Sequence, residues 1–343
     1  MSKIAYRAVY EELHRRIRER LLIPGELMPG EKRLAEEYQV SRTTARKALQ
    51  LLSERGFISS RAGVGWEVLR SAPGPKAPSR PWTIGIDPIA PGWGAYYQEL
   101  LMKGILDAAQ QDSCRLTVLD NRDPKTLNVA GIDGLLMMWV GDENYAPYAA
   151  LAEKGLPIAF INRQPENPRF SFFSVDYTRE AYRAVEYLLM AGHREIMMVI
   201  GGGASMELRE RGYYQAFAAH RLPSPSGLVL RDPTVDELAG VLKERRPTAA
   251  FLLFGCQTPT FAVAAERAGL QIPGDVSLIC FDDMDRVAGV SFPVSCIRMP
   301  LFQMGQAALT HLLRRLEEPE TEPVRRIVGA ELCINSSCRI LEP

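Results

Sequence analysis

The chain has 343 residues, of which 46% are hydrophobic and 24% are charged. This composition excludes a disordered or fibrous protein, and the length allows two or three globular domains. No apolar run approaches the roughly 18 residues that a membrane-spanning helix needs, and no N-terminal apolar stretch resembles a signal peptide. We therefore expect a cytoplasmic protein.

The formal net charge is zero, but the charges are distributed unevenly. Residues 1–70 hold 14 Lys and Arg against 9 Asp and Glu, so this segment carries +5. Residues 71–82 add Lys76 and Arg80, and the remainder carries −7, with 25 basic and 32 acidic residues. A basic segment gains from counterion release on phosphates, whereas an acidic body is repelled from them. The distribution favours a DNA-binding head joined to a separate control domain.

Three helices are predicted in the head. The first covers residues 6–22, and the second covers residues 31–38 after Pro29-Gly30. The third, residues 42–54, has Ser41 as a good N-cap and Gly56 as a candidate C′ glycine. Apolar residues spaced i, i+3, i+4 and i+7 give it one packing stripe, formed by Ala45, Ala48, Leu49 and Leu52.

The exposed N-terminal end of the third helix carries Arg and Thr side chains, which suit the major groove of DNA. An ordinary surface helix with solvated arginines would show the same pattern. The residues concerned are Arg42, Thr43, Thr44 and Arg46. Residues 57–60 and 66–69 then read as two short strands around a glycine-rich turn. Three helices followed by a hairpin predict an α+β winged helix-turn-helix domain over residues 1–70.

The sequence of residues 6–70 resembles that of the GntR family of bacterial repressors. The pieces that carry the resemblance are Ile23-Pro24-Gly25, Pro29, Glu31, Leu34-Ala35, Val40-Ser41-Arg42-Thr43-Thr44, Arg46, Ala48-Leu49 and Gly63-x-Gly65. The resemblance implies base or phosphate contacts for the third helix, a phosphate contact for Lys32, and a wing tip at Gly63 that approaches the minor groove. Gly30 stands where the family usually has a Ser that caps the second helix. The full set of implied DNA-binding residues is Lys32, Ser41, Arg42, Thr43, Thr44, Arg46, Arg61 and Gly63.

Residues 71–81 are rich in proline and predict a semi-rigid linker. From Trp82 onward, short apolar strands alternate with amphipathic helices, which predicts parallel sheets with ligands beyond the carboxyl ends of the strands. The predicted helices are residues 97–111, 178–191, 208–220, 235–245 and 260–268. The predicted strands are residues 83–86, 115–119, 134–139, 158–161, 174–175, 196–200, 228–230, 249–254 and 277–281.

Residues 82–338 resemble the LacI/GalR effector domain, which has the two-lobed type I periplasmic-binding-protein fold. The matching pieces include Ile132-Asp133-Gly134, Ala191-Gly192-His193-Arg194-Glu195-Ile196, Phe281-Asp282-Asp283 and Met304-Gly305-x-x-Ala308. The resemblance implies that residues 82–343 form an α/β effector-binding and dimerisation domain. It also implies a homodimer that reads a pseudo-palindromic operator on double-stranded DNA.

The resemblance places effector contacts at Asn162, Arg209 and Asp282. Phe254-Gly255 replaces the usual Asn-Asp pair, and apolar Met138 and Leu301 fall at other lining positions. Aromatic residues including Tyr96, Tyr97, Trp93 and Trp139 either stack on a ligand or pack in the core. We expect a sugar effector and a repressor. The alternative is a regulator with a degenerate cleft that acts constitutively or through a protein partner.

Catalysis is not expected, and neither is a cofactor or metal. The six cysteines form no CxxC pair and do not cluster with the four histidines, so buried free thiols are expected instead of a zinc site. Asp282-Asp283 are adjacent residues at one strand end and point in different directions, which disfavours a shared-proton dyad. Gly201-Gly202-Gly203 lacks a following Lys-Ser/Thr and is expected to be a plain loop.

Overall fold

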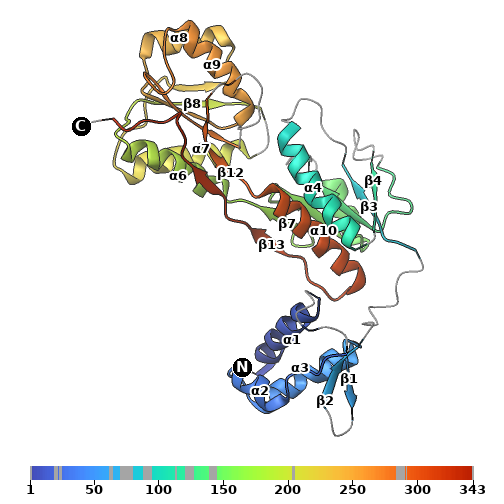
Figure 1. Cartoon of the computed structure of the whole chain (residues 1–343). Coiled ribbons are helices and arrows are strands. Elements are labelled where there is room, and N and C mark those ends of the chain that lie inside the picture. Colours follow the sequence, from blue (N-terminus) through green and yellow to red (C-terminus); the bar gives the residue numbers. More distant parts are fainter. Residues whose placement is uncertain are drawn as a thin grey trace. The chain divides into compact units, whose positions relative to one another are not determined.

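The computed structural model forms two compact units, Met1–Pro81 and Trp82–Pro343 (Figure 1). It describes residues 2–18, 22, 25–61, 65–69, 80–87, 95–112, 114–119, 127–138, 145–202, 205–282, 290 and 292–341. Within these ranges the side chains of residues 2–5, 18, 95 and 96 are not described. The predicted wing-tip residue Gly63 therefore lies outside the described residues, as do Trp93, Trp139 and most of the predicted linker.

The first unit contains three helices and a hairpin. They are α1 Ser2–Arg18, α2 Glu31–Glu37, α3 Arg42–Glu54, β1 Ile58–Arg61 and β2 Gly65–Val68. The two strands are antiparallel, with Ile58 opposite Val68 and Arg61 opposite Gly65. The predicted end of the first helix at residue 22 is wrong, because Leu22 is not helical and its N–H bonds to the Arg16 carbonyl at 3.1 Å.

Helix α3 has the predicted bounds, and its caps explain them. The Ser41 backbone is extended, and its Oγ accepts a hydrogen bond from the Thr44 N–H at 3.1 Å. At the other end Gly56 has a φ of +73°, and two backbone bonds, from Gly56 to Ser53 and from Phe57 to Leu52, close a Schellman motif. The predicted stripe is confirmed, because Ala45, Ala48, Leu49 and Leu52 are fully buried in the core of this unit.

Replacing Ser41 with alanine is expected to destabilise the first unit by about 1 kcal/mol, because the Thr44 N–H loses the Ser41 Oγ acceptor and keeps only the Ser41 carbonyl. The matched variant is Gly30→Ser. Gly30 caps α2 without a side-chain bond, its backbone is extended, and a Cβ there meets no atom within 4 Å. This variant is expected to gain a few tenths of a kcal/mol. Denaturant unfolding of both variants measures the change in the free energy of unfolding, which should be negative for Ser41→Ala and positive for Gly30→Ser. An unchanged unfolding midpoint for Ser41→Ala would contradict a stabilising role of the Ser41 cap.

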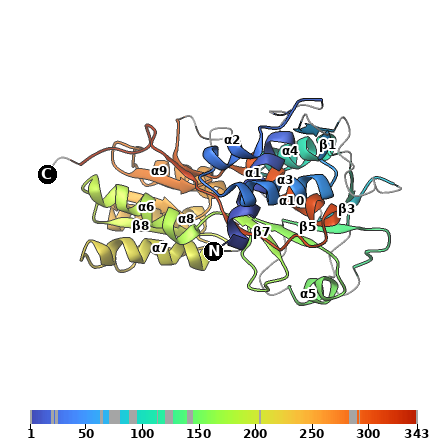
Figure 2. The ribbon, with the colours of Figure 1, turned by 90° about the horizontal axis from the view of Figure 1, so that it is seen from below.

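One lobe of the second unit has a parallel six-stranded sheet in the order β13-β7-β6-β5-β3-β4. Helices α4 and α10 pack on the face of the sheet that carries Leu136 and Ile161 (Figure 2). Helix α5 packs on the opposite face, which carries Leu135 and Phe160. The strands are β3 Thr83–Ile86, β4 Arg115–Val118, β5 Gly134–Met137, β6 Ile158–Ile161, β7 Ser171–Ser174 and β13 Arg325–Ile327. The helices are α4 Ala95–Gln111, α5 Ala146–Glu153 and α10 Leu301–Glu317.

The other lobe repeats the plan with the strand order β14-β12-β11-β10-β8-β9, in which only the β12–β14 pair is antiparallel. Helices α6 and α7 pack on one face and α8 and α9 on the other. The strands are β8 Ile196–Ile200, β9 Val229–Arg231, β10 Ala249–Leu252, β11 Ser277–Phe281, β12 Ser295–Arg298 and β14 Glu331–Cys333. The helices are α6 Tyr177–Met190, α7 Met206–Ala219, α8 Val235–Arg245 and α9 Thr258–Arg267, preceded by the 3₁₀ turn η3 Gly255–Gln257.

The chain passes between the lobes three times, from β7 to α6, from β12 to α10 and from β13 to β14 (Figure 1). The predicted parallel βα architecture is confirmed, but helices α5 and α10 and strands β12 to β14 were not predicted. Several strand ends were also placed too late. Strand β5 ends at Met137 because the Met138 N–H turns to the buried Asp87 carboxylate, at 2.8 Å.

The cysteines only partly follow the expectation. Cys280 and Cys296 are buried, but Cys256 is exposed because it lies in the η3 turn and not in a strand. Within the described ranges, no three or more His, Cys, Asp or Glu gather in a way that could hold a metal ion. None of the described helices is both long and apolar enough to cross a bilayer.

Candidate functional site

The first candidate surface lies at the N-terminal end of α3. Arg42, Thr43 and Arg46 are exposed there, whereas Thr44 is half-buried and its hydroxyl lies 2.8 Å from that of Ser41. Lys32 on α2 is also exposed. The amphipathic pattern of α3 explains this division, because the buried stripe points into the core of the unit and leaves the Arg side chains outside.

Two of the exposed arginines are held by carboxylates. Arg46 makes a two-bond ion pair with Glu31, with Nε and Nη2 each donating at 2.8 Å. These bonds hold the pKa of Glu31 below its usual value. In the hairpin, Arg61 Nη1 donates one hydrogen bond to Glu67 at 2.9 Å. Both arginine side chains remain about 60% exposed, so each keeps donors available to a ligand.

The second candidate site lies at the carboxyl ends of the parallel strands of the larger unit. Asn162 directly follows β6 and Asp282 directly follows β11. Both have a left-handed backbone, with φ of +58° and +76°. Asn and Asp adopt this conformation more readily than most residues, and it turns their side chains away from the strand direction. The topology therefore brings polar groups of both lobes to adjoining sheet edges.

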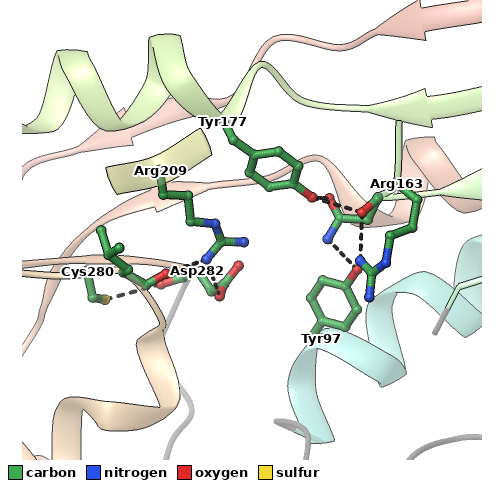
Figure 3. A network of polar contacts seen from close by, with 8 residues as sticks. Tyr97, Arg163, Tyr177, Arg209, Cys280 and Asp282 are labelled. Atoms are coloured by element: carbon green, nitrogen blue, oxygen red, sulfur yellow. Dashed lines mark hydrogen bonds and ion pairs between the residues drawn. The ribbon is translucent and has the colours of Figure 1, made fainter. Parts of the chain in front are cut away.

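Asn162 is held by aromatic residues from two helices, Tyr97 of α4 and Tyr177 of α6, and Figure 3 labels both tyrosines. Its Nδ2 donates to the Tyr97 hydroxyl oxygen at 2.6 Å, and the Tyr177 hydroxyl donates to its backbone carbonyl at 3.0 Å and touches its side-chain oxygen. Arg163 Nη1 donates to the same carbonyl at 2.7 Å. Burial raises the pKa of both tyrosines, so they remain protonated and act as neutral hydrogen-bonding groups.

Arg209 organises the opposite side of the site from the first turn of α7 (Figure 3). Its Nη1 donates to the Leu253 carbonyl at the end of β10 and lies 3.9 Å from Asp282 Oδ2. The guanidinium carbon lies 4.0 Å from the centre of the Phe281 ring and 4.9 Å from that of Tyr177. The aromatic faces and the carboxylate together fix the position of this buried cation.

Two buried atoms of this pair have no hydrogen-bond partner among the described residues. They are Arg209 Nε and Asp282 Oδ1. Burial raises the pKa of Asp282 despite the nearby guanidinium. Buried polar atoms without partners are uncommon in proteins, and a ligand with hydroxyl groups can satisfy a donor and an acceptor at once.

Tyr177 connects the two halves of the site, and sequence reasoning missed it. It touches Asn162 through its hydroxyl and packs its ring 5.9 Å from that of Phe281. The only signal in the sequence was an aromatic residue at the start of a helix that follows a strand. Arg163 was missed as well, although it directly follows Asn162.

The other predicted effector residues are placed less clearly. Met138 and Leu301 are at most 5% exposed and belong to the same hydrophobic core cluster. Phe254 is half-buried between β10 and η3. The side chain of Tyr96 is outside the described residues, as is Asp283, which follows Asp282 in the sequence. The effector assignments therefore remain predictions.

Comparisons with known proteins agree with this two-domain organisation. Residues 5–68 match the family described as bacterial regulatory proteins, gntR family, and residues 185–338 match the periplasmic binding protein-like domain. A similar curated protein is the arabinose metabolism transcriptional repressor of Geobacillus stearothermophilus. It is 24% identical over 344 residues, which cover 92% of each chain.

Solved structures of transcription regulators share the fold. A LacI family transcriptional regulator from Enterococcus faecium with bound ribose aligns with a TM-score of 0.64 and 22% identity, covering 76% of this chain and 100% of that one. The transcriptional regulator CelR in complex with cellobiose aligns with a TM-score of 0.65 and 20% identity, covering 87% of this chain and 92% of that one. The protein thus joins an N-terminal domain of the bacterial gntR regulatory family to a periplasmic-binding-protein-like domain with the fold of LacI-family regulators.

Proposed function

We propose that the protein is a bacterial transcriptional repressor whose affinity for its operator is controlled by a sugar bound between the two lobes. The observation that carries the proposal is the pairing of two structures in one chain. A basic winged helix exposes Arg and Thr at the start of α3, and a two-lobed domain presents Arg209 and Asp282 with unpartnered buried atoms. The first can bind DNA and the second can bind a polyol.

The relatives support both halves of the proposal. The relative that spans most of the chain is named a repressor of arabinose metabolism, and two structural neighbours hold ribose and cellobiose. An Arg can donate two aligned hydrogen bonds to vicinal hydroxyls, and an Asp can accept from them. These are the groups that Arg209 and Asp282 provide. We infer that the effector is a small sugar or glycoside.

The repressor is proposed to act as a homodimer on a pseudo-palindromic operator. Each head would place the first turns of α3 in a major-groove half-site, with Arg42, Thr43, Thr44 and Arg46 facing the bases or phosphates. Lys32 and Arg61 would contact the flanking backbone. A sugar that binds one arrangement of the lobes more tightly would shift operator affinity, and a coupling of about 1–3 kcal/mol corresponds to roughly 5–150-fold.

The test begins with duplexes selected by the full-length protein from a random-sequence pool. Binding of the best duplex is then measured by fluorescence anisotropy with arabinose, ribose, cellobiose and other mono- and disaccharides present. We expect a salt-sensitive preference for the selected duplex and release by one sugar class. Binding without any sugar response would instead favour a regulator whose cleft is degenerate. Absence of any duplex preference would contradict DNA-binding regulation altogether.

A further inference from the structure

Two arginines of the proposed DNA-binding set, Arg46 and Arg61, form ion pairs, and Arg46 is held more firmly than Arg61. The Arg46 Nε donates to Glu31 Oε1 and its Nη2 to Glu31 Oε2, both at 2.8 Å. Arg61, by comparison, has one hydrogen bond to Glu67 and no second donor on that carboxylate among the described residues. Two parallel bonds fix the plane of a guanidinium, whereas one bond leaves it free to turn.

The Glu31 pair occupies only one edge of the Arg46 guanidinium. A guanidinium has five N–H donors in a planar arrangement, and Glu31 uses one from Nε and one from Nη2. The outer edge, which consists of Nη1 and the remaining N–H of Nη2, is left for another partner. Two donors with this spacing match the O6 and N7 acceptors of guanine in the major groove. The Arg46 side chain is 59% exposed, so this edge is accessible to DNA.

A carboxylate on this surface is unfavourable if charge alone matters. Glu31 lies beside Arg46 and close enough to Arg42 that both lower its pKa. It therefore reduces the positive charge that would face phosphates and weakens binding to any duplex. A gain in sequence selectivity offsets this loss if the carboxylate holds the Arg46 guanidinium in the orientation that contacts guanine. Ordering the long side chain in advance also reduces the conformational entropy lost on binding.

We propose that Glu31 is a positioning residue for sequence readout, which orients the Arg46 guanidinium so that its outer edge reads a guanine in the major groove. The inference rests on the proposed DNA-binding function and specifies how one side chain of that surface selects sequence. Glu31 itself touches no base in this arrangement. Its effect is exerted through Arg46.

The experiment compares four full-length proteins: wild type, Glu31→Gln, Glu31→Asp and Glu36→Gln. The probes are the duplex selected by wild type and a scrambled duplex of the same composition, each titrated at several salt concentrations. Glu31→Asp keeps the charge but shortens the side chain. Glu36 lies on the same helix, is exposed, and has no side-chain hydrogen bond or ion pair among the described residues, so Glu36→Gln is the matched charge control.

Both Glu31 variants are expected to lose about fivefold or more in the ratio of selected to scrambled affinity, a part of what a bidentate base contact provides. Glu31→Gln should bind the scrambled duplex at least as tightly as wild type, because it removes a negative charge. Glu36→Gln should change both affinities equally and keep the ratio. Retention of the wild-type ratio by Glu31→Asp would show that charge alone matters and would overturn the proposal. Thermal unfolding of each variant verifies that the head remains folded.

Replacement of single guanines by 7-deazaguanine, which lacks the N7 acceptor, identifies the base that Arg46 reads. One position should weaken wild type but leave Arg46→Ala unaffected, with an intermediate loss for Glu31→Gln. If Arg46→Ala instead weakens both probes by the same factor and lowers the salt slope by about one, Arg46 binds phosphate and the readout proposal is wrong. A wild-type protein without preference for its selected duplex would contradict the proposed function itself, which separates the two failures.

Discussion

Replacing Gly104 with alanine is expected to lower the free energy of unfolding of the larger unit by about 3 kcal/mol or more. Gly104 lies where α4 and α10 cross closely, and a Cβ there would approach the backbone carbonyl carbon of Phe302 to 2.8 Å. The contact is reciprocal, since a Cβ at Gly305 would lie 2.5 Å from the Leu101 carbonyl oxygen. Backbone atoms cannot turn aside, so the helices must separate and lose packing against the sheet.

The control for this prediction is Gly240→Ala in α8, where a Cβ meets no atom within 4 Å. Alanine is favoured over glycine inside a helix by about 1 kcal/mol, so this variant is expected to stabilise the same unit. Scanning calorimetry of the full chain measures both changes in one transition. Opposite signs support the packing argument. A Gly104→Ala protein as stable as Gly240→Ala would show that α4 and α10 can accommodate the added Cβ without losing their packing.

The structure of the first unit could largely be predicted from its sequence, because the signals that set its helix bounds are local. Ser41 and Gly56 are caps whose geometry depends on a few neighbouring residues, and the apolar stripe of α3 repeats with the helical period. The bounds of α3 were therefore predicted without error. Strand ends were less predictable, because β5 ends where the Met138 N–H meets the Asp87 carboxylate, which is 51 positions earlier in the chain. Apolar strand patterns carry no information about such a distant partner.

The candidate effector site shows the same division. The family resemblance indicated Asn162 and Asp282, which directly follow β6 and β11, and Arg209, which lies in the first turn of α7. Tyr177 was not indicated, because its role depends on the crossing from β7 to α6, which brings an aromatic residue between Asn162 and Arg209. The Glu31–Arg46 pair was also missed, since it joins two helices and no periodicity reports on contacts between them.

Replacing Arg209 with methionine is expected to abolish operator release by the effector sugar while leaving operator affinity unchanged in its absence. The substitution keeps much of the side-chain length but removes the donors to Leu253 and the charge beside Asp282. The sugar that acts on wild type serves as the ligand, with calorimetric titration and anisotropy as measurements. We also expect a loss of stability of about 3 kcal/mol at neutral pH, because the Asp282 carboxylate is left buried without an opposite charge beside it.

The pH dependence of this loss has a defined sign. Burial already raises the folded-state pKa of Asp282 above its value in the unfolded chain, and Arg209 counteracts the rise. In Arg209→Met the folded-state pKa therefore moves higher still. A group with a raised folded-state pKa supports the fold when protonated and weakens it as the pH rises through that value. The stability deficit of the variant should thus shrink as the pH falls towards the ordinary carboxyl range.

The double variant Arg209→Met/Asp282→Asn separates stability from ligand binding. A neutral Asn removes the buried charge, so the double variant should regain most of the lost stability at neutral pH but remain unresponsive to the sugar. Arg231→Ala is the matched control. Arg231 ends β9 and forms a surface ion pair with Glu210, which follows Arg209 in α7. The sugar response of this variant should equal that of wild type. A double variant that recovers both stability and release would mean that Arg209 only neutralises Asp282, and that the sugar is recognised by other residues.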